Sequence, residues 1–467
     1  MIRSPIAALA AALALAAQPA SAQLIGGGGL PGLPGVGLPT TDLPRPSPPR
    51  ARTPRTPPLA APESLVRETV PPLAGAVGET LEAVPAQLRR LRLEELLRAH
   101  PQVLEQDEAG APVVSGRVLA LAPTEDALAA ARQTGFEVVE RADLAAIGVQ
   151  LIVLRPPSGL SAREAVQRLR QLDPAGTYEF DHLYADAGQA AAPGGGTGRP
   201  APRRRGAVRI GLVDTGVAAR HPALASGRIV QRGFAPGGLT VQPHGTAVAS
   251  LLAGRSGAFR GAAPGAELYV ADVYGSGPTG GSAAILVRAL AWLAEMRTPV
   301  INVSLVGPPN RVLEAAVQGL SARGHLLVAA VGNDGPAAPP LYPAAYPGVV
   351  AVTGVDGRGR ALLEAGRGEH VDFAAPGADM AAAHPSGGFA PVRGTSFAAP
   401  LVAGELARRL GEPDPAAAAR AVSGLSRLAA DLGPKGRDRT FGAGLVAADR
   451  RTAPAAVAAR GPAIRGD

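Results

Sequence analysis

The sequence predicts an α/β domain, built on a parallel sheet flanked by helices, preceded by a small α+β unit. Apolar strands and helices alternate through residues 207–450, and polar residues follow several of the strands directly. A chain of 467 residues also suggests two to three domains. The expected strands of the α/β domain lie near 208–213, 268–273, 300–303, 326–331 and 349–355, and its helices near 281–296, 311–322 and 396–410.

The α+β unit is expected over residues 81–187. An amphipathic helix near 81–104 comes first; it could lie on a membrane surface, but packing on the following unit is the simpler interpretation. Thr124 is expected to cap a helix to about 134, and Ser161 with Glu164 forms a capping box for a helix to about 172. With strands near 114–121, 136–141, 149–154 and 177–184, two helices on an antiparallel sheet give a ferredoxin-like arrangement.

The remaining segments are expected to lack a folded core. Residues 1–22 have an early arginine, a short apolar run and Ala20-Ser21-Ala22, which predicts a cleaved secretory signal and an exported protein, periplasmic or secreted. Residues 23–80 are rich in proline and glycine and predict a disordered stalk, 188–206 a linker, and 451–467 a disordered tail. The apolar run at the N-terminus is too short to span a bilayer, so we expect no transmembrane segment in the mature protein.

Composition excludes several classes of protein. The net charge is +8, but the basic residues are nearly all arginines scattered among alanine, glycine and proline, with 3% aromatic residues. No basic helix with interleaved aromatic residues is present, so we expect no nucleic-acid partner. The chain has no cysteine, which rules out disulfides but not export, because its length allows a core without them.

Four short motifs place chemically useful side chains at the ends of predicted elements. Asp214 ends an apolar strand, and His244 begins a helix rich in small residues. Asn333 follows the strand near 326–331, and Ser396 lies where glycine and threonine lead into an alanine-rich helix. Ligand and catalytic groups gather at the carboxyl ends of parallel strands, and a helix N-terminus offers unpaired N–H groups to an oxyanion.

Asp-Thr-Gly, His-Gly-Thr, Gly-Asn and Gly-Thr-Ser-x-Ala-x-Pro, in this order, resemble the motifs of subtilisin-type (subtilase) serine peptidases over about residues 207–450. The resemblance implies a subtilisin-like catalytic domain. Ser396 would be the nucleophile, His244 the general base and Asp214 the group that orients the histidine, while Asn333 would contribute to an oxyanion hole. A lone aspartate, histidine, asparagine or serine at such a place is usually a turn or capping residue, so the prediction depends on the four motifs together.

The resemblance also implies a zymogen. Subtilases are commonly made with an N-terminal propeptide of α+β architecture that assists folding and then inhibits the enzyme with its C-terminal tail. We expect residues 81–187 to have this role; a permanent accessory domain is the alternative. Self-cleavage near Ala187 and cutting by a second protease after Arg203-Arg204-Arg205 both fit the linker sequence.

Substrate choice is implied only through the family's main specificity pocket. Subtilases usually have a glycine where Val306 stands, and Leu341 falls where small residues are frequent, so we expect a narrowed pocket that accepts small or medium apolar side chains. Asp334, near the rim, is the one residue that could attract a basic side chain. The residues expected to line the pocket are Ser304, Leu305, Val306, Gly307, Ala329, Ala330, Val331, Gly332 and Leu341.

Together these features predict an exported serine endopeptidase that acts as a monomer on protein or peptide substrates and binds its own prodomain. The alternatives are a catalytically silent binding or scaffold protein and a processing enzyme with a single partner. No cofactor is required for this chemistry. Structural calcium is common in the family, but no oxygen-ligand cluster with a readable spacing supports it here. The six histidines outside the motifs are expected to be structural: His100, His182, His221, His325, His370 and His384.

Overall fold

The computed structural model describes residues 84–186, 189–190 and 208–457. The predicted signal (1–22), the stalk (23–80) and most of the linker (188–206) lie outside the described residues. Among the described residues, no helix combines the length and apolar character needed to cross a membrane.

A seven-stranded sheet forms the centre of the peptidase-like half, and every neighbouring pair of strands is parallel. Its order is β17-β16-β15-β13-β8-β12-β9, and the inner strands are buried and almost wholly apolar, as expected for strands covered on both faces. The predicted parallel sheet is therefore confirmed. Its strands are β8 (Arg209–Asp214), β9 (Ile229–Gly233), β12 (Glu267–Asp272), β13 (Val300–Val303), β15 (Leu326–Ala330), β16 (Val349–Val355) and β17 (Val371–Pro376).

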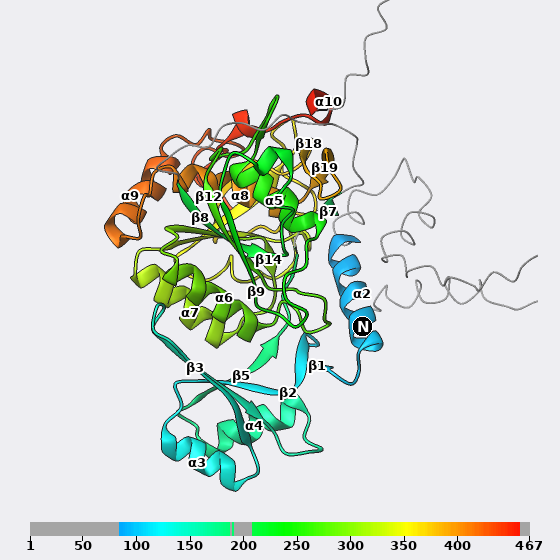
Figure 1. The fold of residues 1–467 in the computed structure, drawn as a ribbon, viewed down its shortest axis with the longest axis vertical. Coiled ribbons are helices and arrows are strands. Elements are labelled where there is room, and N and C mark those ends of the chain that lie inside the picture. The colour runs from blue at the N-terminus through cyan, green and yellow to red at the C-terminus, as the bar shows by residue number, and fades with distance from the viewer. Residues whose placement is uncertain (1–83, 187–188, 191–207, 458–467) are drawn as a thin grey trace, which may run out of the picture. The chain divides into compact units, whose positions relative to one another are not determined.

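Helices cover both faces of this sheet (Figure 1). Alternate side chains of β15 point to opposite faces: Val328 packs with α5 (Pro243–Ala253) and α8 (Thr395–Ala407), whereas Leu327 packs with α6 (Ala283–Glu295) and α7 (Arg311–Ala322). Helix α9 (Pro415–Ser426) joins the α5 and α8 side. Helices α5 and α8 thus contact each other and β8 on one face of the sheet, and His244 and Phe397 bring their first turns together.

The α+β unit consists of a five-stranded antiparallel sheet and two helices that cover one of its faces. Thr124 caps α3 by accepting a hydrogen bond from the Ala127 N–H, and Ser161 and Glu164 form both bonds of the predicted capping box of α4. Helix α2 (Val84–Ala99) precedes the sheet, and its residues Leu96 and Leu97 pack next to Leu104. The other elements are β1 (Leu104–Gln106), β2 (Pro112–Leu121), α3 (Glu125–Gln133), β3 (Glu137–Leu144), β4 (Val149–Arg155), α4 (Ala162–Leu172) and β5 (Thr177–His182).

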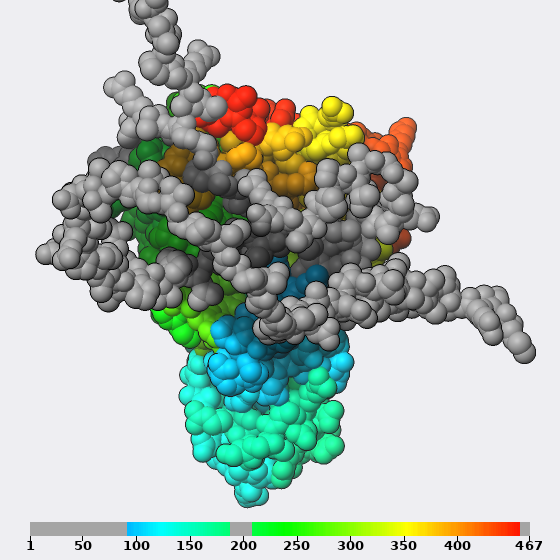
Figure 2. Space-filling view, turned by 90° about the vertical axis from the view of Figure 1, so that its right-hand side faces the viewer, coloured from blue at the N-terminus to red at the C-terminus, as the bar shows by residue number. Residues whose placement is uncertain are grey.

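The second face of this small sheet is not open to solvent. Ile152 and Leu154 of β4 pack under α3 and α4, while Leu151 and Val153 belong to the cluster that contains α6 and α7 of the peptidase-like half. Gly319 of α7 permits close approach, because a side chain there would meet the carbonyl oxygen of Ile147 at 1.9 Å. Both faces of the small sheet are therefore buried. Figure 2 shows the outer surface of the α+β unit in blue to blue-green.

Beyond β5 the chain runs along the peptidase-like half. Leu183 bridges to Ser282, and β6 (Ala185–Asp186) then pairs antiparallel with β14 (Leu305–Val306). After two residues that are not described, β7 (Gln189–Ala190) pairs antiparallel with β19 (Phe389–Arg393), which also pairs with β18 (Met380–Ala383). The segment that joins the two halves is thus held on both sides of that gap.

The C-terminal segment differs from the sequence prediction. The prediction of disorder from residue 451 does not hold for its first residues, because the Thr452 carbonyl accepts a hydrogen bond from the Ala381 N–H and α10 (Pro454–Val457) follows. Arg451 donates to the Asp379 carbonyl. The minor elements are η2 (Pro222–Leu224), β10 (Arg255–Ser256), β11 (Phe259–Arg260) and η3 (Ala448–Arg450).

Candidate active site

Asp214 and His244 form a buried pair at the carboxyl end of β8. The Nδ1 atom of His244 lies 2.9 Å and 3.0 Å from the two carboxylate oxygens of Asp214. The Thr215 N–H also donates to this carboxylate at 2.8 Å, and Asp214 is only 1% exposed. Because a carboxylate can only accept, Nδ1 carries the hydrogen of this contact. In the neutral ring Nε2 is then the atom free to accept a proton.

The Nε2 atom of His244 is buried and has no hydrogen-bond partner among the described residues. His244 lies in the first turn of α5, after Pro243, which suits the start of a helix. Its ring centroid is 5.4 Å from that of Phe397, the residue after Ser396. The basic nitrogen is therefore oriented by Asp214 and lies close to the first turn of α8.

Ser396 is fully buried in the first turn of α8, where backbone N–H groups have no partner one turn earlier. Gly394 precedes the helix with φ of 134°, a conformation that favours glycine, so the chain can turn sharply into it. The Ser396 hydroxyl donates to the Ser304 carbonyl at 3.0 Å, and the Ser304 hydroxyl donates to the Ser396 carbonyl at 2.9 Å. In this structure the serine is thus held against the strand that ends at Val303.

Asn333 lies beside the same turn. Its side-chain oxygen accepts hydrogen bonds from the N–H and the hydroxyl of Thr395, both at 3.1 Å. The Thr395 hydroxyl also accepts from the Gly332 N–H at 3.2 Å. Since the oxygen is committed to Thr395, the orientation of the amide is fixed and its nitrogen is the donor end. The structure thus brings all four predicted residues to one place.

The pKa of His244 is raised to about 9. Burial alone lowers the pKa, because it disfavours the charged ring, but the charge and the hydrogen bond of Asp214 raise it by more. The Asp186 carboxylate in β6 adds to the increase. Part of the affinity of His244 for a proton therefore comes from the segment that precedes the peptidase-like half.

A model of the subtilase family matches residues 205–444, just over half of the chain. The chain belongs to the subtilase family. It is 36% identical to subtilisin Savinase of Lederbergia lenta over 220 residues, which are 44% of this chain and 79% of that protein. It is 34% identical over 251 residues to an alkaline protease of Alkalihalobacillus alcalophilus, covering 51% of this chain and 64%, less than two thirds, of that protease.

A solved structure shares this fold. Fervidolysin from Fervidobacterium pennivorans, described as a keratinolytic enzyme related to subtilisin, superposes with a TM-score of 0.62 at 20% sequence identity. The superposition covers 72% of this subtilase and 61% of fervidolysin. The similarity therefore extends beyond the half of the chain that the family model matches, at the level of the fold.

The residues predicted to line the specificity pocket lie in two neighbouring segments of this subtilase. Leu305 and Val306 form β14, which contacts β15, and Gly332 follows β15. A side chain placed on Gly332 would meet Cδ1 of Leu341 at 2.6 Å and Cγ1 of Val306 at 3.6 Å. Val306 and Leu341, the two residues that depart from the family pattern, therefore both have side-chain atoms next to Gly332. The other predicted lining residues in these segments are Ser304, Gly307, Ala329, Ala330 and Val331.

Two residues that shape the site were not predicted from the sequence. Thr395 fixes the Asn333 amide, and only its place directly before Ser396 could have indicated this role. Asp272 is fully buried at the end of β12 and accepts hydrogen bonds from the N–H groups of Thr240, Tyr274 and Gly275. It thereby fixes the loop that leads to His244. Its signal was its position at a strand end, which it shares with Asp214.

Three of the histidines outside the motifs make contacts of a structural kind. His221 accepts from the Ala223 N–H at 3.1 Å at the start of η2, and its Nε2 lies 2.9 Å from the Gly388 carbonyl. His182 lies 3.0 Å from the Asp107 carboxylate, and His325 lies 2.7 Å from the Thr298 carbonyl. No group of three or more potential metal-ligating side chains occurs in the part of the chain that the structure describes.

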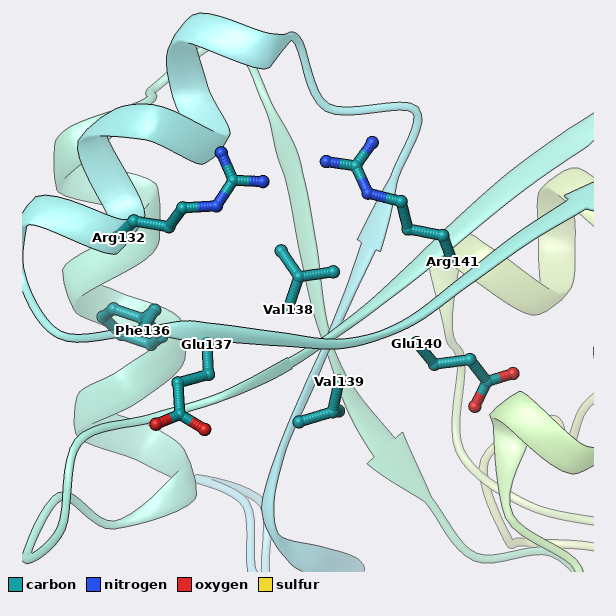
Figure 3. A pocket seen from close by; sticks show the side chains of 7 residues that line it. All are labelled: Arg132, Phe136, Glu137, Val138, Val139, Glu140 and Arg141. Carbon is teal, nitrogen blue, oxygen red and sulfur yellow. The ribbon is translucent and has the colours of Figure 1, made fainter.

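An open surface hollow of about 570 Å³ lies elsewhere, along the edge strand β3 (Figure 3). Arg132 and Arg141 project to one side of the strand and Glu137 and Glu140 to the other (Figure 3). Three of these charges are paired: Arg141 with Glu125, Glu137 with Arg155, and Glu140 with Arg288 of α6. The hollow is lined only by residues of the α+β unit, so it is separate from the candidate active site.

Proposed function

We propose that this subtilase is a serine endopeptidase in which Ser396, His244 and Asp214 act as nucleophile, general base and orienting carboxylate. The observation that carries the proposal is the buried His244–Asp214 contact, which leaves Nε2 without a partner among the described residues beside the first turn of α8, where Ser396 lies. Four motifs and the family match support the same assignment.

The chemistry follows from this arrangement. The Ser396 hydroxyl leaves the Ser304 carbonyl, gives its proton to Nε2 of His244 and attacks the carbonyl carbon of the substrate. Asp214 stabilises the imidazolium through Nδ1, and the ring then passes the proton to the departing amine. The Asn333 amide and the Ser396 backbone N–H are the proposed donors to the oxyanion. Water then takes the place of the amine: it gives a proton to Nε2 of His244 and attacks the acyl carbon, and His244 returns the proton to the Ser396 oxygen as the acid product leaves.

The protein is proposed to be made as a precursor that cuts itself between Asp186 and Gln189. Strand β6 pairs with β14, which directly follows Ser304, and β7 pairs with β19 at Arg393, three residues before Ser396. The strands on either side of residues 187 and 188 are therefore each paired with a segment close to Ser396, because Ser304 is hydrogen-bonded to Ser396 and Arg393 lies three residues before it. This arrangement favours self-cleavage near Ala187 over a cut at the later arginines. The α+β unit would then be a prodomain whose tail occupies the substrate cleft.

A preference for small residues directly before the cut bond agrees with the sequence of the proposed cleavage site. Leu341 and Val306 narrow the expected pocket, and the linker after Asp186 reads Ala187-Gly188-Gln189-Ala190. The protein's own sequence thus offers residues of the size that the pocket would admit. Export, proposed from residues 1–22, agrees with an enzyme kept inactive by its prodomain until it has folded.

The deciding experiment compares the wild-type protein with Ser396→Ala after expression. We expect mass spectrometry to find a new N-terminus between residues 187 and 189 in the wild type and an intact linker in the variant. The processed wild type should also be labelled on Ser396 by a fluorophosphonate probe. Identical trimming of Ser396→Ala would show that another protease makes the cut, and absence of labelling in the processed wild type would contradict the peptidase assignment.

A catalytically silent scaffold protein is the second candidate, because a prodomain-like tail in the cleft would also suit a permanent binding module. It predicts an intact linker in both proteins and no labelling. A processing enzyme with a single partner would be labelled but would leave general protein substrates such as casein uncut.

A further inference from the structure

His221 joins the short helix η2 to the tip of the hairpin formed by β18 and β19. Its imidazole is buried, with 6% of the residue exposed. The Nδ1 atom accepts a hydrogen bond from the Ala223 N–H at 3.1 Å, and the Nε2 atom lies 2.9 Å from the Gly388 carbonyl. Because a carbonyl oxygen can only accept, Nε2 carries the hydrogen of the second contact. The arrangement therefore requires a neutral ring with its one N–H at Nε2.

The hairpin connects His221 to the candidate active site. Phe389, the first residue of β19, contacts the His221 ring edge to face, with centroids 5.8 Å apart. Strand β19 ends at Arg393, three residues before Ser396, and it pairs with β7. A change at the tip of the hairpin would therefore affect both the chain that leads into Ser396 and the strand that follows the proposed cleavage site.

A second proton on the ring would break this arrangement. Protonation at Nδ1 turns the acceptor of the Ala223 N–H into a donor, so that two N–H groups would face each other across 3.1 Å. Burial lowers the pKa of His221, the hydrogen bond to the Gly388 carbonyl opposes this effect, and the charge of His384 adds to the decrease. The protonated ring is therefore disfavoured by its contacts as well as by its burial.

The surroundings of His221 offer no carboxylate to a protonated ring. Helix η2 packs next to α5 and β10, which lie within residues 215–266, and the hairpin spans residues 380–393. Neither range contains an aspartate or a glutamate. Besides His221, the charged or titratable residues of both ranges are all basic: Arg220, Arg228, Arg232, His244, Arg255, Arg260, His384 and Arg393. A positive charge on His221 would thus be buried among other positive charges.

We propose that protonation of His221 opens the β18–β19 hairpin, so that this subtilase has an acid-sensitive latch on the strand that leads to Ser396. Since the pKa of the latched ring lies below the ordinary value of 6.5, the latch is fully stable above pH 6.5 and loses stability as the pH falls below it. The latch involves neither the proton of His244 nor the Ser396 hydroxyl, so it does not depend on the proposed peptidase function.

The test measures hydrogen exchange by mass spectrometry on the full-length chain with Ser396→Ala, which prevents self-digestion. Protection of residues 384–393, corrected for the intrinsic effect of pH on exchange, is compared between about pH 7.5 and about pH 5. The loss can reach about 30-fold, because pH 5 lies 1.5 pH units below 6.5, and we expect at least about fivefold. Peptides from β15 are the internal control and should change by less than about twofold.

Two variants identify the histidine that is responsible. His221→Gln keeps a donor for the Gly388 carbonyl but cannot titrate, so the loss of protection at pH 5 should fall below about twofold. His384→Gln is the matched control, because it removes the other histidine of the same region and leaves His221 in place; the loss should remain at least about threefold. The exchange of β15 shows whether each variant is folded.

Several results would overturn the inference. The first is unchanged protection of residues 384–393 at pH 5 in the Ser396→Ala chain, which needs no further variant. The second is an equal loss in β15, which would indicate global unfolding instead of a local opening. The third is a loss that persists in a folded His221→Gln variant or disappears in His384→Gln. Failure of the peptidase assignment would change none of these measurements, so the two proposals are tested separately.

Discussion

Asp181 connects the two halves of the chain through a buried charged hydrogen bond. It lies in β5 of the α+β unit, is 0% exposed, and accepts from the Ala284 N–H at 2.9 Å. Ala284 is in the first turn of α6, where the capping residue Ser282 makes no side-chain cap hydrogen bond. The α+β unit thus supplies from outside the acceptor that a helix N-terminus requires.

The replacement Asp181→Ala removes this acceptor and leaves Arg117, 3.5 Å from the same carboxylate, with Glu140 as its remaining acidic neighbour. A hydrogen bond to a charged group contributes roughly 1.5–3 kcal/mol, and a carboxylate at a partly buried helix N-terminus up to about 2 kcal/mol. The two figures describe largely the same contact and are not added, so we expect the free energy of binding between the α+β unit and the peptidase-like half to weaken by about 2–3 kcal/mol. This corresponds to a prodomain that binds about 30- to 150-fold more weakly.

The assay follows the freshly processed complex of cleaved prodomain and enzyme. Diluting the complex releases prodomain, and the concentration at which half of the activity toward a small substrate appears gives the dissociation constant. Asp181→Asn is the matched control: it keeps a side-chain oxygen but loses the charge, so the dissociation constant should rise by less than about tenfold. A dissociation constant for Asp181→Ala within threefold of the wild type would refute the reasoning.

Three further predictions concern the catalytic centre. Self-cleavage requires neutral His244, so the rate of self-cleavage should rise with pH, with a midpoint near the His244 pKa of about 9. In a gel time course, Asp186→Asn should move this midpoint to lower pH, because the Asp186 carboxylate raises the His244 pKa. An unchanged midpoint would contradict that role of Asp186. Asn333→Ala should lower kcat about 10²- to 10³-fold, the loss measured for such a donor in subtilisin, with a kcat near that of the wild type counting against the oxyanion role. Leu341→Gly should raise kcat/KM at least about tenfold for a peptide with phenylalanine, relative to alanine, before the cut; an unchanged ratio in a peptide-library profile would show that Leu341 does not limit the pocket.

The same pKa has a consequence for stability. The pKa of His244 in the folded protein, about 9, lies above the ordinary value of 6.5. The His244–Asp214 contact therefore contributes its full stabilisation below about pH 6.5, and this contribution is lost as the pH rises through about 9. The contact stabilises the protein most when His244 is protonated, at low pH, whereas the proposed general base must be neutral, which requires high pH.

The places of the candidate catalytic residues in the fold could be predicted because each residue is tied to a local pattern. Asp214 ends an apolar strand, Pro243 and His244 open a helix, and Gly394 allows the turn into the helix that carries Ser396. Parallel strands place their carboxyl ends at one edge, so the order of elements was enough to bring these residues together. Capping residues such as Thr124 and Ser161 were predictable for the same reason, since their partners lie within a few residues.

Contacts between distant segments have no such local signal. Nothing in the sequence around Asp181 indicates that its carboxylate meets α6, because 103 residues separate it from Ala284. Tyr184 likewise lies against Gly281, Gly307 and Tyr346, each of which has the local sequence of an ordinary loop or core residue. The proposed inhibition by the α+β unit would depend on such long-range contacts, whereas the proposed chemistry depends on the local motifs.

One sequence pattern did contain information about the contact between the halves. Strand β4 reads Val149-Gln150-Leu151-Ile152-Val153-Leu154, with four consecutive apolar residues where a sheet covered on one face would alternate. Such a run requires cover on both faces, yet α3 and α4 cover only one. The second cover is α6 and α7, so an α+β unit released as the proposed prodomain would expose Leu151 and Val153 to water. Exposed apolar surface of this kind destabilises the free unit. If the α+β unit is released as proposed, the apolar residues that hold it against α6 and α7 would therefore also make the free unit less stable.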